Sequence, residues 1–349
     1  MNTKKIYLGL FLLITIILSA CQSKSAPTED SADHAAPLLG TIITAKAYGP
    51  QAEEALSLAF KRVREIENKM SRLLDGSEVD LINQNAGKQA VPISPDTYFV
   101  IDSALDYAKK TDGTFNPVVG NLIELWAIGT EDAKVPTQEE IDLFLPYLDY
   151  HQLVLTENPY TAELTSDKIK LDLGAIAKGY AGDEMARILL EKGITSALLN
   201  LGGNVVVIGN KPDDTPWTIG IQNPLEEERG EIAGIVKATN TSVVTSGSYE
   251  RFFEEDNVRY HHIMDPATGY PAENGIISST IISPSSTQAD ALSTAVYILG
   301  KEKGLSLIES LSGVEAIIIT DDHKIHTTSG IDGNLFTLKS EAFLYEKRR

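Results

Sequence analysis

The sequence predicts an α+β protein, organised as a single domain with mixed, largely antiparallel sheets flanked by helices. Amphipathic runs with helix start and stop signals are concentrated in the first half of the chain. Short β-branched runs, separated by Gly, Pro, Asn or Asp, follow in the second half. Because these runs do not alternate as regular strand-helix-strand units, antiparallel pairing is favoured over a parallel sheet.

The amino terminus has the pattern of a signal peptide. Lys4 and Lys5 precede an apolar stretch over residues 6–18, which leads into Leu-Ser-Ala-Cys ending at Cys21. The stretch is shorter than the run of about 20 apolar residues that a bilayer-spanning helix needs, so residues 1–20 are predicted to be a signal peptide. Leu-Ser-Ala-Cys resembles a bacterial lipobox, which implies cleavage before Cys21 and lipid on that cysteine. The alternative is an ordinary secretory signal in which the cysteine has no role.

A lipidated cysteine implies a protein held at the extracytoplasmic face of the cell membrane. Residues 22–36 are polar, small and aperiodic, so 21–36 is predicted to comprise the lipidated cysteine and a flexible tether. The remainder, 37–349, is predicted to be one domain because no second low-complexity linker divides it. Cys21 is the only cysteine, so the mature domain has no internal disulfide, thiol nucleophile or zinc thiolate cluster.

The charge of the chain excludes several classes of partner. It has 30 basic and 49 acidic side chains and a formal net charge of -19. Binding to nucleic acid and flat adsorption on anionic lipid both depend on lysine and arginine, so neither is expected. A negatively charged ligand would need a locally positive site on this acidic protein, most simply a bound cation together with helix N-termini.

A strand and two helices are predicted at the start of the domain. Residues 38–48 are rich in isoleucine and threonine and alternate in part, as a strand does. Over residues 51–70, apolar side chains recur at steps of three and four, which predicts an amphipathic helix. A second helix is predicted between Ser94 as N-cap, with Pro95 in its first turn, and Gly113 as its stop.

Two further helix starts follow in the middle of the chain. Thr137 and Glu140 form a capping box ahead of a short helix. A strand is predicted to end at Asp172 and Leu173 and to pass through Gly174 into another helix.

The rest of the chain is predicted to be mostly strands. The expected strand runs are 197–209, 217–222, 231–238, 242–246, 258–264 and 276–283. A helix over 287–299 follows the last of them and stops at Gly300. Residues 314–320 and 324–328 flank Asp321-Asp322 and are predicted to close the domain as a hairpin.

The helix start after Gly174 has the layout of a phosphate-binding turn. Free backbone N–H groups and the positive end of the helix dipole favour an anion there. Small residues between Ala175 and Gly182 would let a flat ligand lie against the backbone, and Lys178 could neutralise its charge. The alternative is a tightly packed turn with a solvated lysine. Gly-Lys-Ser/Thr does not occur here, so the segment is not a Walker P-loop.

Asp290 and Thr294 lie four residues apart on the predicted 287–299 helix and therefore share a face. A carboxylate and a hydroxyl together suit Mg²⁺, which takes few protein ligands and completes its octahedron with waters and substrate phosphates. The alternative is that Asp290 caps the helix start and Thr294 bonds back to a carbonyl.

Two adjacent histidines, His261 and His262, lie in a predicted strand, where only one of them can face a given side. The functional interpretation is a general base at the strand end, with its pKa near the working pH. The Asp265-Pro-Ala-Thr-Gly turn that follows is a sufficient structural reason for Asp265. Three other segments have the composition of ligand-binding loops but are also typical of ordinary turns: 111–117, 199–204 and 245–249.

Taken together, these segments resemble the ApbE family of FAD:protein FMN transferases. The matching residues are Leu39-Gly40-Thr41, Met70-Ser71, Gly113 to Pro117 with Leu125-Trp126, Asp172 to Tyr180, Asn200 to Asn204, Thr245-Ser246-Gly247, His262 to Gly269 and Ala289 to Thr294. They occur in the family's order and span nearly the whole mature chain.

The resemblance implies a transferase that binds FAD as a substrate and Mg²⁺ as a cofactor. FMN would be joined through a phosphoester to a threonine or serine hydroxyl of an acceptor protein, with release of AMP. The implied partners are FAD, extracytoplasmic acceptor flavoproteins and, through the lipid anchor, the membrane.

Family roles carried to matching positions give a complete candidate site. The implied flavin or phosphate contacts are Leu39, Leu73, Thr114, Phe115, Asn116, Asp172, Lys178 and Ile263. The implied metal ligands are the Ala175 carbonyl, Asp290 and Thr294, and His262 is the implied base that takes the proton from the acceptor hydroxyl.

The sequence departs from the family at three of these positions. Leu39 stands where methionine is usual, Leu73 where an aromatic ring is frequent, and Asn116 where aspartate is common. Loss of an aromatic stacking partner could loosen the flavin contact or shift the balance from transfer toward hydrolysis.

Two other functions use the same residues. One is a hydrolase of the same architecture that splits FAD into FMN and AMP, and the other is a lipid-anchored FAD carrier without catalysis. A carrier has no need of a Mg²⁺ pair beside a candidate base, which favours an enzyme. Neither the acceptor protein nor the oligomeric state follows from the sequence.

Overall fold

The structure, a computed structural model, describes residues 30–226 and 230–347. The predicted signal peptide and Cys21 lie outside the described residues. Within the described ranges, every helix is too short or too polar to cross a membrane.

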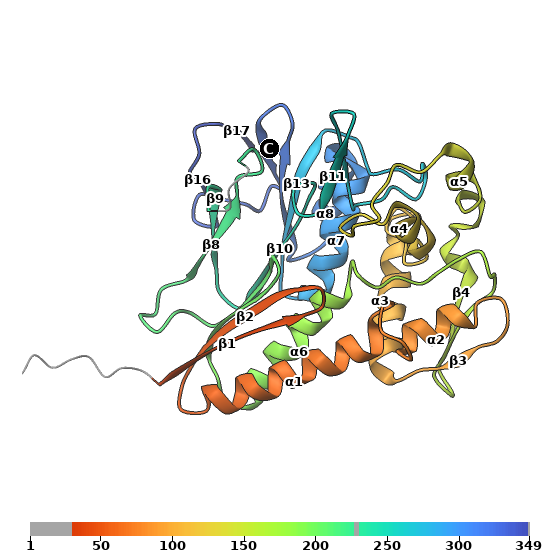
Figure 1. The fold of residues 1–349 in the computed structure, drawn as a ribbon. Helices are drawn as coiled ribbons and strands as arrows, with labels where there is room; N and C mark the ends of the chain where they lie inside the picture. The colour runs from red at the N-terminus through yellow and green to blue at the C-terminus, as the bar shows by residue number, and fades with distance from the viewer. Residues whose placement is uncertain (1–29, 227–229, 348–349) are drawn as a thin grey trace, which may run out of the picture.

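The described chain folds as an α+β protein, as predicted (Figure 1). Its helices are α1 (Ala52–Met70), α2 (Glu78–Gln84), α3 (Pro95–Lys110), α4 (Gly120–Trp126), α5 (Gln138–Asp142), α6 (Ala177–Glu191), α7 (Ser286–Leu299) and α8 (Lys301–Glu309). Its strands are β1 (Ser31–Leu38), β2 (Thr41–Tyr48), β3 (Val91–Pro92), β4 (Leu153–Thr156), β5 (Thr161–Leu164), β6 (Ser196–Leu201), β7 (Asn204–Ile208), β8 (Trp217–Gln222), β9 (Ile232–Ala238), β10 (Thr241–Gly247), β11 (Phe252–Glu255), β12 (Val258–His261), β13 (Ile276–Ser283), β14 (Glu315–Thr320), β15 (Lys324–Thr327), β16 (Phe336–Leu338) and β17 (Leu344–Lys347).

A nine-stranded sheet forms the centre of the described chain. Its order is β1-β2-β6-β7-β10-β13-β14-β15-β17. Neighbouring strands pair antiparallel except β15 and β17, which pair parallel. The prediction of mixed, largely antiparallel sheets is therefore confirmed.

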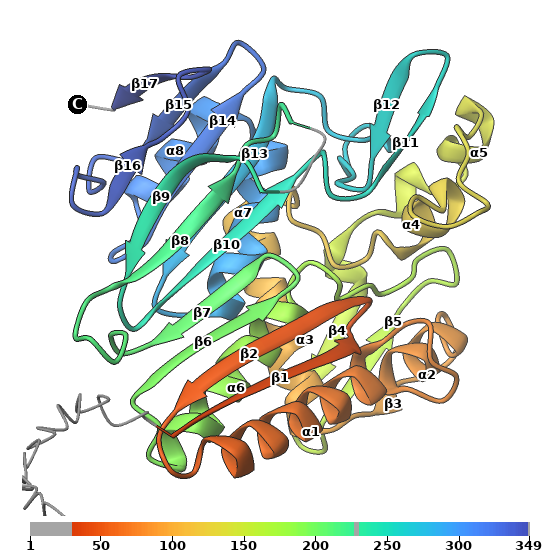
Figure 2. The same ribbon diagram turned by 60° about the vertical axis from the view of Figure 1, so that its left-hand side comes forward.

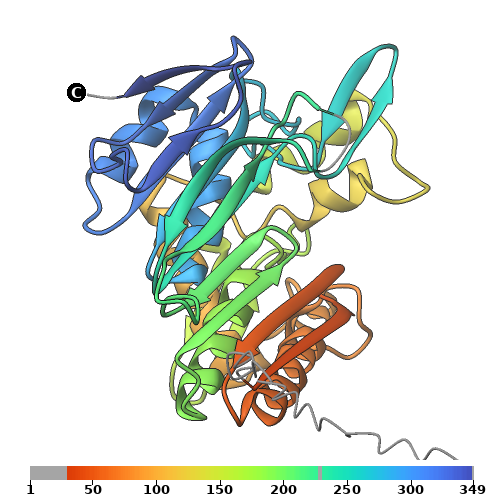
Figure 3. The same ribbon diagram turned by 90° about the vertical axis from the view of Figure 1, so that its left-hand side faces the viewer.

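Helices pack against one face of this sheet, and a second, smaller sheet packs against the other. Along β7, Val206 and Ile208 enter the core shared with α1, α6 and α7, whereas Val207 enters a second core on the opposite face. The three-stranded sheet β16-β9-β8 closes that second core through side chains such as Trp217 and Phe336. Figures 2 and 3 show the strands of β8 and β9 on one side of the central sheet and the helices on the other.

The N-terminal hairpin corrects the predicted boundary of the tether. β1 pairs with β2 along its whole length, so residues 31–36 belong to the folded domain rather than to a flexible tether. The segment lacks a strand's apolar alternation, but an edge strand needs only one pairing partner and partial burial. Ala32 and Leu38 supply that burial, and the His34 ring packs on Phe60 of α1.

Several predicted strands differ from the observed ones, and the strand predicted over 258–264 ends at His261. The strand predicted over 38–48 begins at Thr41, because Leu39 and Gly40 form the hairpin turn. The run 197–209 is divided into β6 and β7 by the Gly202-Gly203 turn. The strand predicted to end at Asp172 is reduced to an isolated bridge at Lys170, since the Asp172 N–H donates to a loop carbonyl, that of Pro117.

The helix predictions agree closely with the structure. The predicted helices over 51–70 and 287–299 correspond to α1 and α7, and the Thr137–Glu140 capping box is present at α5. Ser94 occupies the N-cap position of α3, but its hydroxyl donates to Glu78 (3.0 Å) instead of capping the helix. The predicted closing hairpin is the antiparallel pair β14 and β15.

Candidate functional site

Two glycines let α6 and α7 approach each other closely. A Cβ at Gly179 would lie 2.3 Å from the Ser286 carbonyl oxygen, and a Cβ at Gly182 would lie 3.0 Å from Ser286 Oγ. A side chain at Gly179 would therefore force the helices apart. The small residues that suggested a surface for a flat ligand serve, at these two positions, to pack one helix on the other.

The N-terminus of α7 is capped from α6. The Asp183 carboxylate accepts hydrogen bonds from the backbone N–H groups of Ser286 (2.7 Å) and Thr287 (2.9 Å). Ser285 Oγ accepts a further one from the Gln288 N–H (3.2 Å). The alternative in which Asp290 caps this helix is therefore wrong.

The Asp290 carboxylate lies between the two helices and is only 3% exposed. Its Oδ2 accepts from the Gly179 N–H at 2.8 Å, and its Oδ1 accepts from Lys178 Nζ at 3.1 Å. Gly179 is the third residue of α6, so its N–H has no intrahelical acceptor, and the Ala175 carbonyl lies ahead of the helix. Among the described residues no hydrogen bond ends on that carbonyl. A buried carboxylate and a carbonyl without a partner thus lie at the same end of α6.

The Lys178 side chain is partly buried rather than solvated, which contradicts the alternative of a packed turn with a solvated lysine. Its Nζ lies 3.1 Å from Asp290 Oδ1 and 3.4 Å from Asn204 Oδ1. Lys178 is the second residue of α6, so the ammonium and the positive end of the helix dipole lie together. They form the locally positive site that an acidic chain needs to bind an anion.

Thr294 lies on α7 one turn after Asp290, as the spacing predicts. Its Oγ1 is 3.4 Å from Ser246 Oγ of β10, which in turn is 2.8 Å from Ser293 Oγ. The side chain that bonds back to a helix carbonyl is Ser293, whose Oγ donates to the Asp290 carbonyl oxygen (2.9 Å). The Thr294 hydroxyl therefore belongs to a polar cluster that faces the sheet.

The place where the N-terminal turn of α6 meets α7, around Lys178, Asp290 and Thr294, is called the α6–α7 junction. Its oxygen donors fit a hard divalent cation. The set comprises the carboxylate of Asp290, the hydroxyl of Thr294 and the carbonyl of Ala175 that lacks a hydrogen bond. Mg²⁺ is characteristically held by one or two carboxylates and completes its shell with waters and substrate phosphates. In the part of the chain that the structure describes, no group of three or more His, Cys, Asp or Glu side chains gathers as a metal site.

Asp172 is held by an arginine that the sequence reasoning missed. Arg72 Nε donates to Asp172 Oδ2 at 2.5 Å, and the Gly174 N–H donates to Asp172 Oδ1 at 2.7 Å. Arg72 directly precedes Leu73, which was identified, and follows the matching Met70-Ser71 segment. Its adjacency to that segment is the one signal in the sequence that points to it.

The loop that carries three predicted flavin contacts turns two of them inward. Phe115 is buried, and Asn116 bonds within the protein through both ends of its amide. Asn116 Nδ2 donates to the Leu148 carbonyl oxygen (2.9 Å), and its Oδ1 accepts from the Val118 N–H (3.0 Å). Thr114 is the partly exposed member of the three.

Leu39 occupies a strained turn at the tip of the β1–β2 hairpin. Its φ is +52°, a left-handed conformation that costs a residue with a side chain about 1–2 kcal/mol. Its N–H donates to Glu67 Oε1 of α1 (2.6 Å). The next carbonyl, that of Gly40, accepts from Arg251 Nη2 (3.1 Å). Two distant segments thus hold the turn in place, as is frequent for strained backbone at functional sites.

The remaining two flavin candidates differ in access. Leu73 is 76% exposed, on the loop beside Arg72. Ile263 is buried, and both of its backbone groups form hydrogen bonds. Its N–H donates to His261 Nδ1 (3.3 Å), and its carbonyl oxygen accepts from the Ala272 N–H (2.9 Å). Leu73 can be reached directly by a ligand, whereas Ile263 can act only through its apolar side chain.

His262 follows β12 directly, at the end of a strand as predicted. Its Nδ1 lies 3.2 Å from the Arg251 carbonyl oxygen, which also accepts its backbone N–H (3.1 Å). Burial lowers the pKa of His262 to about 4, and the charges of Arg251 and Lys178 act in the same direction.

His261 points to the other side of the strand, as the alternation requires. It is buried, with Nε2 3.1 Å from the Ala272 carbonyl oxygen and its ring packed edge-on against Tyr297. Burial lowers the pKa of His261 to about 4 as well. Its surroundings are those of a core residue.

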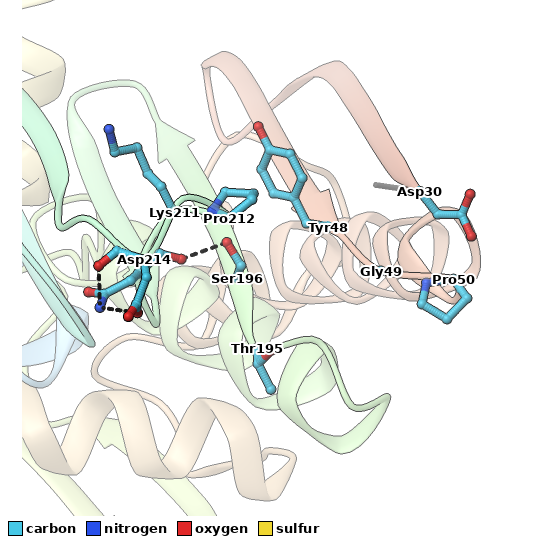
Figure 4. A pocket seen from close by; sticks show the side chains of 10 residues that line it. Asp30, Tyr48, Gly49, Pro50, Thr195, Ser196, Lys211, Pro212 and Asp214 are labelled. Carbon is cyan, nitrogen blue, oxygen red and sulfur yellow. Dashed lines mark hydrogen bonds between the residues drawn. The ribbon is translucent and has the colours of Figure 1, made fainter. Parts of the chain in front are cut away.

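A cavity of about 500 Å³ lies elsewhere, where β2 and β6 meet the loop after β7 (Figure 4). Its lining includes Tyr48, Ser196 and Lys211, and contains none of the predicted site residues. The hydrogen bonds drawn there, such as Ser196 Oγ to the Asn210 carbonyl oxygen (2.7 Å), tie the loop to itself and to β6. The candidate site is therefore the α6–α7 junction and not this cavity.

Comparisons with known proteins show which family this chain is similar to. The ApbE family model matches residues 39–318. A FAD:protein FMN transferase from Treponema pallidum (strain Nichols) is 35% identical over 350 residues, covering 95% of this chain and 96% of the relative. The crystal structure of the ApbE protein from Thermotoga maritima superposes with a TM-score of 0.78 at 33% identity, covering 86% and 97% of the two chains. The flavin transferase ApbE from Vibrio cholerae gives a TM-score of 0.75 at 26% identity, with 90% and 98% covered.

Proposed function

This chain belongs to the ApbE family and transfers FMN from FAD to a protein, and we propose that the α6–α7 junction is the place where the transfer occurs. In the proposed reaction, a threonine or serine hydroxyl oxygen of the acceptor bonds to the phosphorus of the FMN moiety. The bond from that phosphorus to the bridging oxygen breaks, and AMP leaves with the oxygen. The proton of the hydroxyl passes to His262.

One observation carries the proposal: the buried Asp290 carboxylate of α7 accepts from the Gly179 N–H in the first turn of α6. The Ala175 carbonyl, which has no hydrogen bond among the described residues, lies just before the same helix, and we propose that Ala175, Asp290 and Thr294 hold Mg²⁺ there. When bound, Mg²⁺ neutralises negative charge on the pyrophosphate oxygens and on the leaving AMP. Phosphoryl transfer depends mainly on positioning and electrostatics, so no thiol nucleophile is required.

The protein's own charges support binding of the pyrophosphate at the same place. The N-terminus of α6 places the positive end of its dipole here, and Lys178 adds an ammonium. Asp172 is kept in position by Arg72 and by the Gly174 N–H, at the entrance to this helix. We assign Asp172 and Lys178 to the FAD contacts on this basis.

The hydrogen bonds of His262 suit a general base. The Arg251 carbonyl oxygen only accepts, so the proton of a neutral His262 lies on Nδ1 and the lone pair on Nε2 is left for the acceptor hydroxyl. Because burial lowers the pKa to about 4, the imidazole is neutral at physiological pH and able to take a proton.

The flavin wall is proposed from the family positions. The contacts are Leu39, Leu73, Thr114, Phe115, Asn116 and Ile263. Leu73 and Thr114 are accessible, and the strained turn holds Leu39 in one position. The three buried residues would act through the shape and packing of the wall rather than through free polar groups.

Anchoring outside the cytoplasm also remains a proposal. Residues 1–20 would be removed, and Cys21 would carry lipid that holds the protein at the extracytoplasmic face of the membrane. Since β1 begins at Ser31, the tether would comprise only residues 22–30. Its acceptors would then be flavoproteins on that side of the membrane. Mass spectrometry of the mature N-terminus tests this, with a diacylated Cys21 expected and an unmodified cysteine contradicting it.

A single assay tests the proposed reaction. The protein is incubated with FAD, Mg²⁺ and a candidate extracytoplasmic acceptor, and flavin fluorescence is sought after denaturing electrophoresis, with AMP measured in parallel. Fluorescence on the acceptor with an equal amount of AMP is expected. AMP and free FMN without labelled acceptor would show hydrolysis, and labelling that persists undiminished in EDTA would contradict the role of Mg²⁺.

A further inference from the structure

Asn204 is a buried amide with one half unpartnered. Its side chain is 2% exposed, and among the described residues its Nδ2 has no hydrogen-bond partner. Its Oδ1 lies 3.4 Å from Lys178 Nζ. An ammonium can only donate, so this contact fixes the oxygen on the lysine side and leaves the N–H donors of Nδ2 facing elsewhere. A buried donor without an acceptor carries a desolvation penalty that a ligand oxygen would remove.

The strand register aims this amide at the α6–α7 junction. Asn204, Val206 and Ile208 alternate onto the helix-facing side of β7, and a Cβ at Gly182 would lie 3.0 Å from Val206 Cγ2. Lys178 lies one turn before Gly182 on α6, so Asn204 is level with the lysine. The tight Gly202-Gly203 turn, with φ of +63° and +98°, lets β7 begin at this residue. Asn204 is thus carried by the central sheet rather than by a loose loop.

Within residues 30–226 and 230–347, no atom accepts a hydrogen bond from Nδ2. Both oxygens of Asp290 are engaged, one by Lys178 Nζ and the other by the Gly179 N–H. Val244, the residue opposite Asn204 on β10, is apolar. An oxygen of a bound molecule would satisfy Nδ2 here. An amide donor beside an ammonium at a helix N-terminus matches a phosphate oxygen better than any neutral group.

We propose that Asn204 binds a pyrophosphate oxygen of FAD through Nδ2, next to Lys178. This inference rests on the proposed function of the junction as the site of the pyrophosphate. It adds to the site a neutral donor that orients the phosphate without changing the local charge. Asn204 belongs to the matching segment Asn200 to Asn204, to which the family resemblance gave no role.

The test measures binding without turnover, on the purified full-length protein in EDTA. Three ligands separate the parts of FAD: FAD itself, ADP, which has the pyrophosphate but no flavin, and riboflavin, which has the flavin but no phosphate. Asn204→Ala should weaken FAD and ADP by about 10- to 100-fold, as expected for loss of a hydrogen bond to a charged oxygen, and leave riboflavin unchanged. Asn204→Asp keeps the shape and should weaken FAD and ADP further, because a carboxylate repels phosphate.

Ser242→Ala is the matched control. Ser242 is also fully buried with an unpartnered Oγ, and it lies on β10 two residues from Val244. Removing this hydroxyl should leave the affinities for all three ligands unchanged. A loss of ADP affinity in Ser242→Ala equal to that in Asn204→Ala would overturn the inference, because the effect would then be a general one of the sheet.

The outcomes separate this inference from the function on which it rests. ADP binding by Asn204→Ala within twofold of wild type, or an equal loss of riboflavin binding, overturns the role of Asn204 alone. Wild-type protein that binds FAD but not ADP overturns the phosphate site itself. Should Asn204→Ala fail to fold, the isosteric Asn204→Asp decides the question by the same comparison of ADP with riboflavin.

Discussion

Helix α6 takes part in two polar clusters that differ in how completely they are satisfied. Toward α1 and α3, Arg62 Nη2 lies 2.6 Å from Asp96 Oδ1 and Arg62 Nε lies 2.8 Å from Glu184 Oε2. The Tyr180 hydroxyl donates to the Asp96 carboxylate (2.9 Å), and Lys69 Nζ of α1 donates to the same carboxylate (2.6 Å). Every partner in this cluster, the Arg62 cluster, meets an opposite charge or a hydrogen-bond acceptor.

The α7 side of the same helix is incomplete. Lys178 meets Asp290, but Asn204 Nδ2 and the Ala175 carbonyl have no hydrogen bond among the described residues. Both clusters are mostly buried, so exposure does not explain the difference. The Arg62 cluster holds three helices together, whereas we propose that the groups left open at the junction bind a ligand. One helix thus has a polar network with complete hydrogen bonding on one side and polar atoms without partners on the other.

The largest effect is expected for Asp290→Asn. The amide keeps the shape but not the charge that we assign to Mg²⁺, so the initial rate of FMN transfer should fall by at least about 10³-fold. Asn Oδ1 can still accept from the Gly179 N–H, but Lys178 loses its charged partner, so stability should fall as well and transfer is expressed per folded molecule. Transfer and unfolding are measured on the same preparation. A wild-type rate would contradict the metal assignment.

Asp96→Ala should give the opposite pattern. Hydrogen bonds from Arg62 and Lys69 hold the pKa of Asp96 well below its usual range, so the native network requires this carboxylate to be charged. Its removal leaves Arg62 without its main partner and should lower the free energy of unfolding by about 3 kcal/mol, measured by urea denaturation. The transfer rate per folded molecule should stay near wild type. A selective loss of transfer would show that the two clusters are not separate in function.

His262→Gln should slow transfer by about 10²-fold by removing the base. The pH dependence of the wild type sharpens this prediction. Burial lowers the pKa of His262 to about 4, so kcat/KM should fall as the pH drops through about 4, where the imidazole becomes protonated. An acid limb centred near 6.5, the value of an unperturbed histidine, would contradict the buried environment assigned to it.

A smaller effect is expected where the two helices touch. Gly179→Ala places a Cβ 2.3 Å from the Ser286 carbonyl oxygen, and separating α6 from α7 should cost about 2 kcal/mol of stability. Gly333→Ala is the control, because a Cβ there meets nothing within 4 Å. Urea denaturation of both variants checks this, and equal stabilities would contradict the close packing.

The sequence was most informative where the relevant contacts are local. Asp290 and Thr294 share a helix face at a fixed spacing, and the glycine turn ahead of Lys178 marks a helix start, so both could be predicted from the chain alone. The fold class followed in the same way, from apolar periodicity and turn residues.

Contacts between distant segments were beyond this reasoning. Arg72 meets Asp172 across 100 residues, and Asn204 meets Lys178 across 26. Nothing in the local pattern of either partner indicates the other. Strand β1 was missed for a related reason, since its pairing is supplied by β2 and its own small residues carry no apolar alternation.

The most direct test of the central claim compares Asp290→Asn with Asp96→Ala in one transfer assay. Both variants are brought to the same concentration of folded protein and incubated with FAD, Mg²⁺ and the acceptor, and covalent flavin on the acceptor is measured over time. The account predicts that Asp96→Ala labels the acceptor at nearly the wild-type rate and that Asp290→Asn does not label it. Labelling by Asp290→Asn at the wild-type rate would contradict the claim that the α6–α7 junction is the site of FMN transfer.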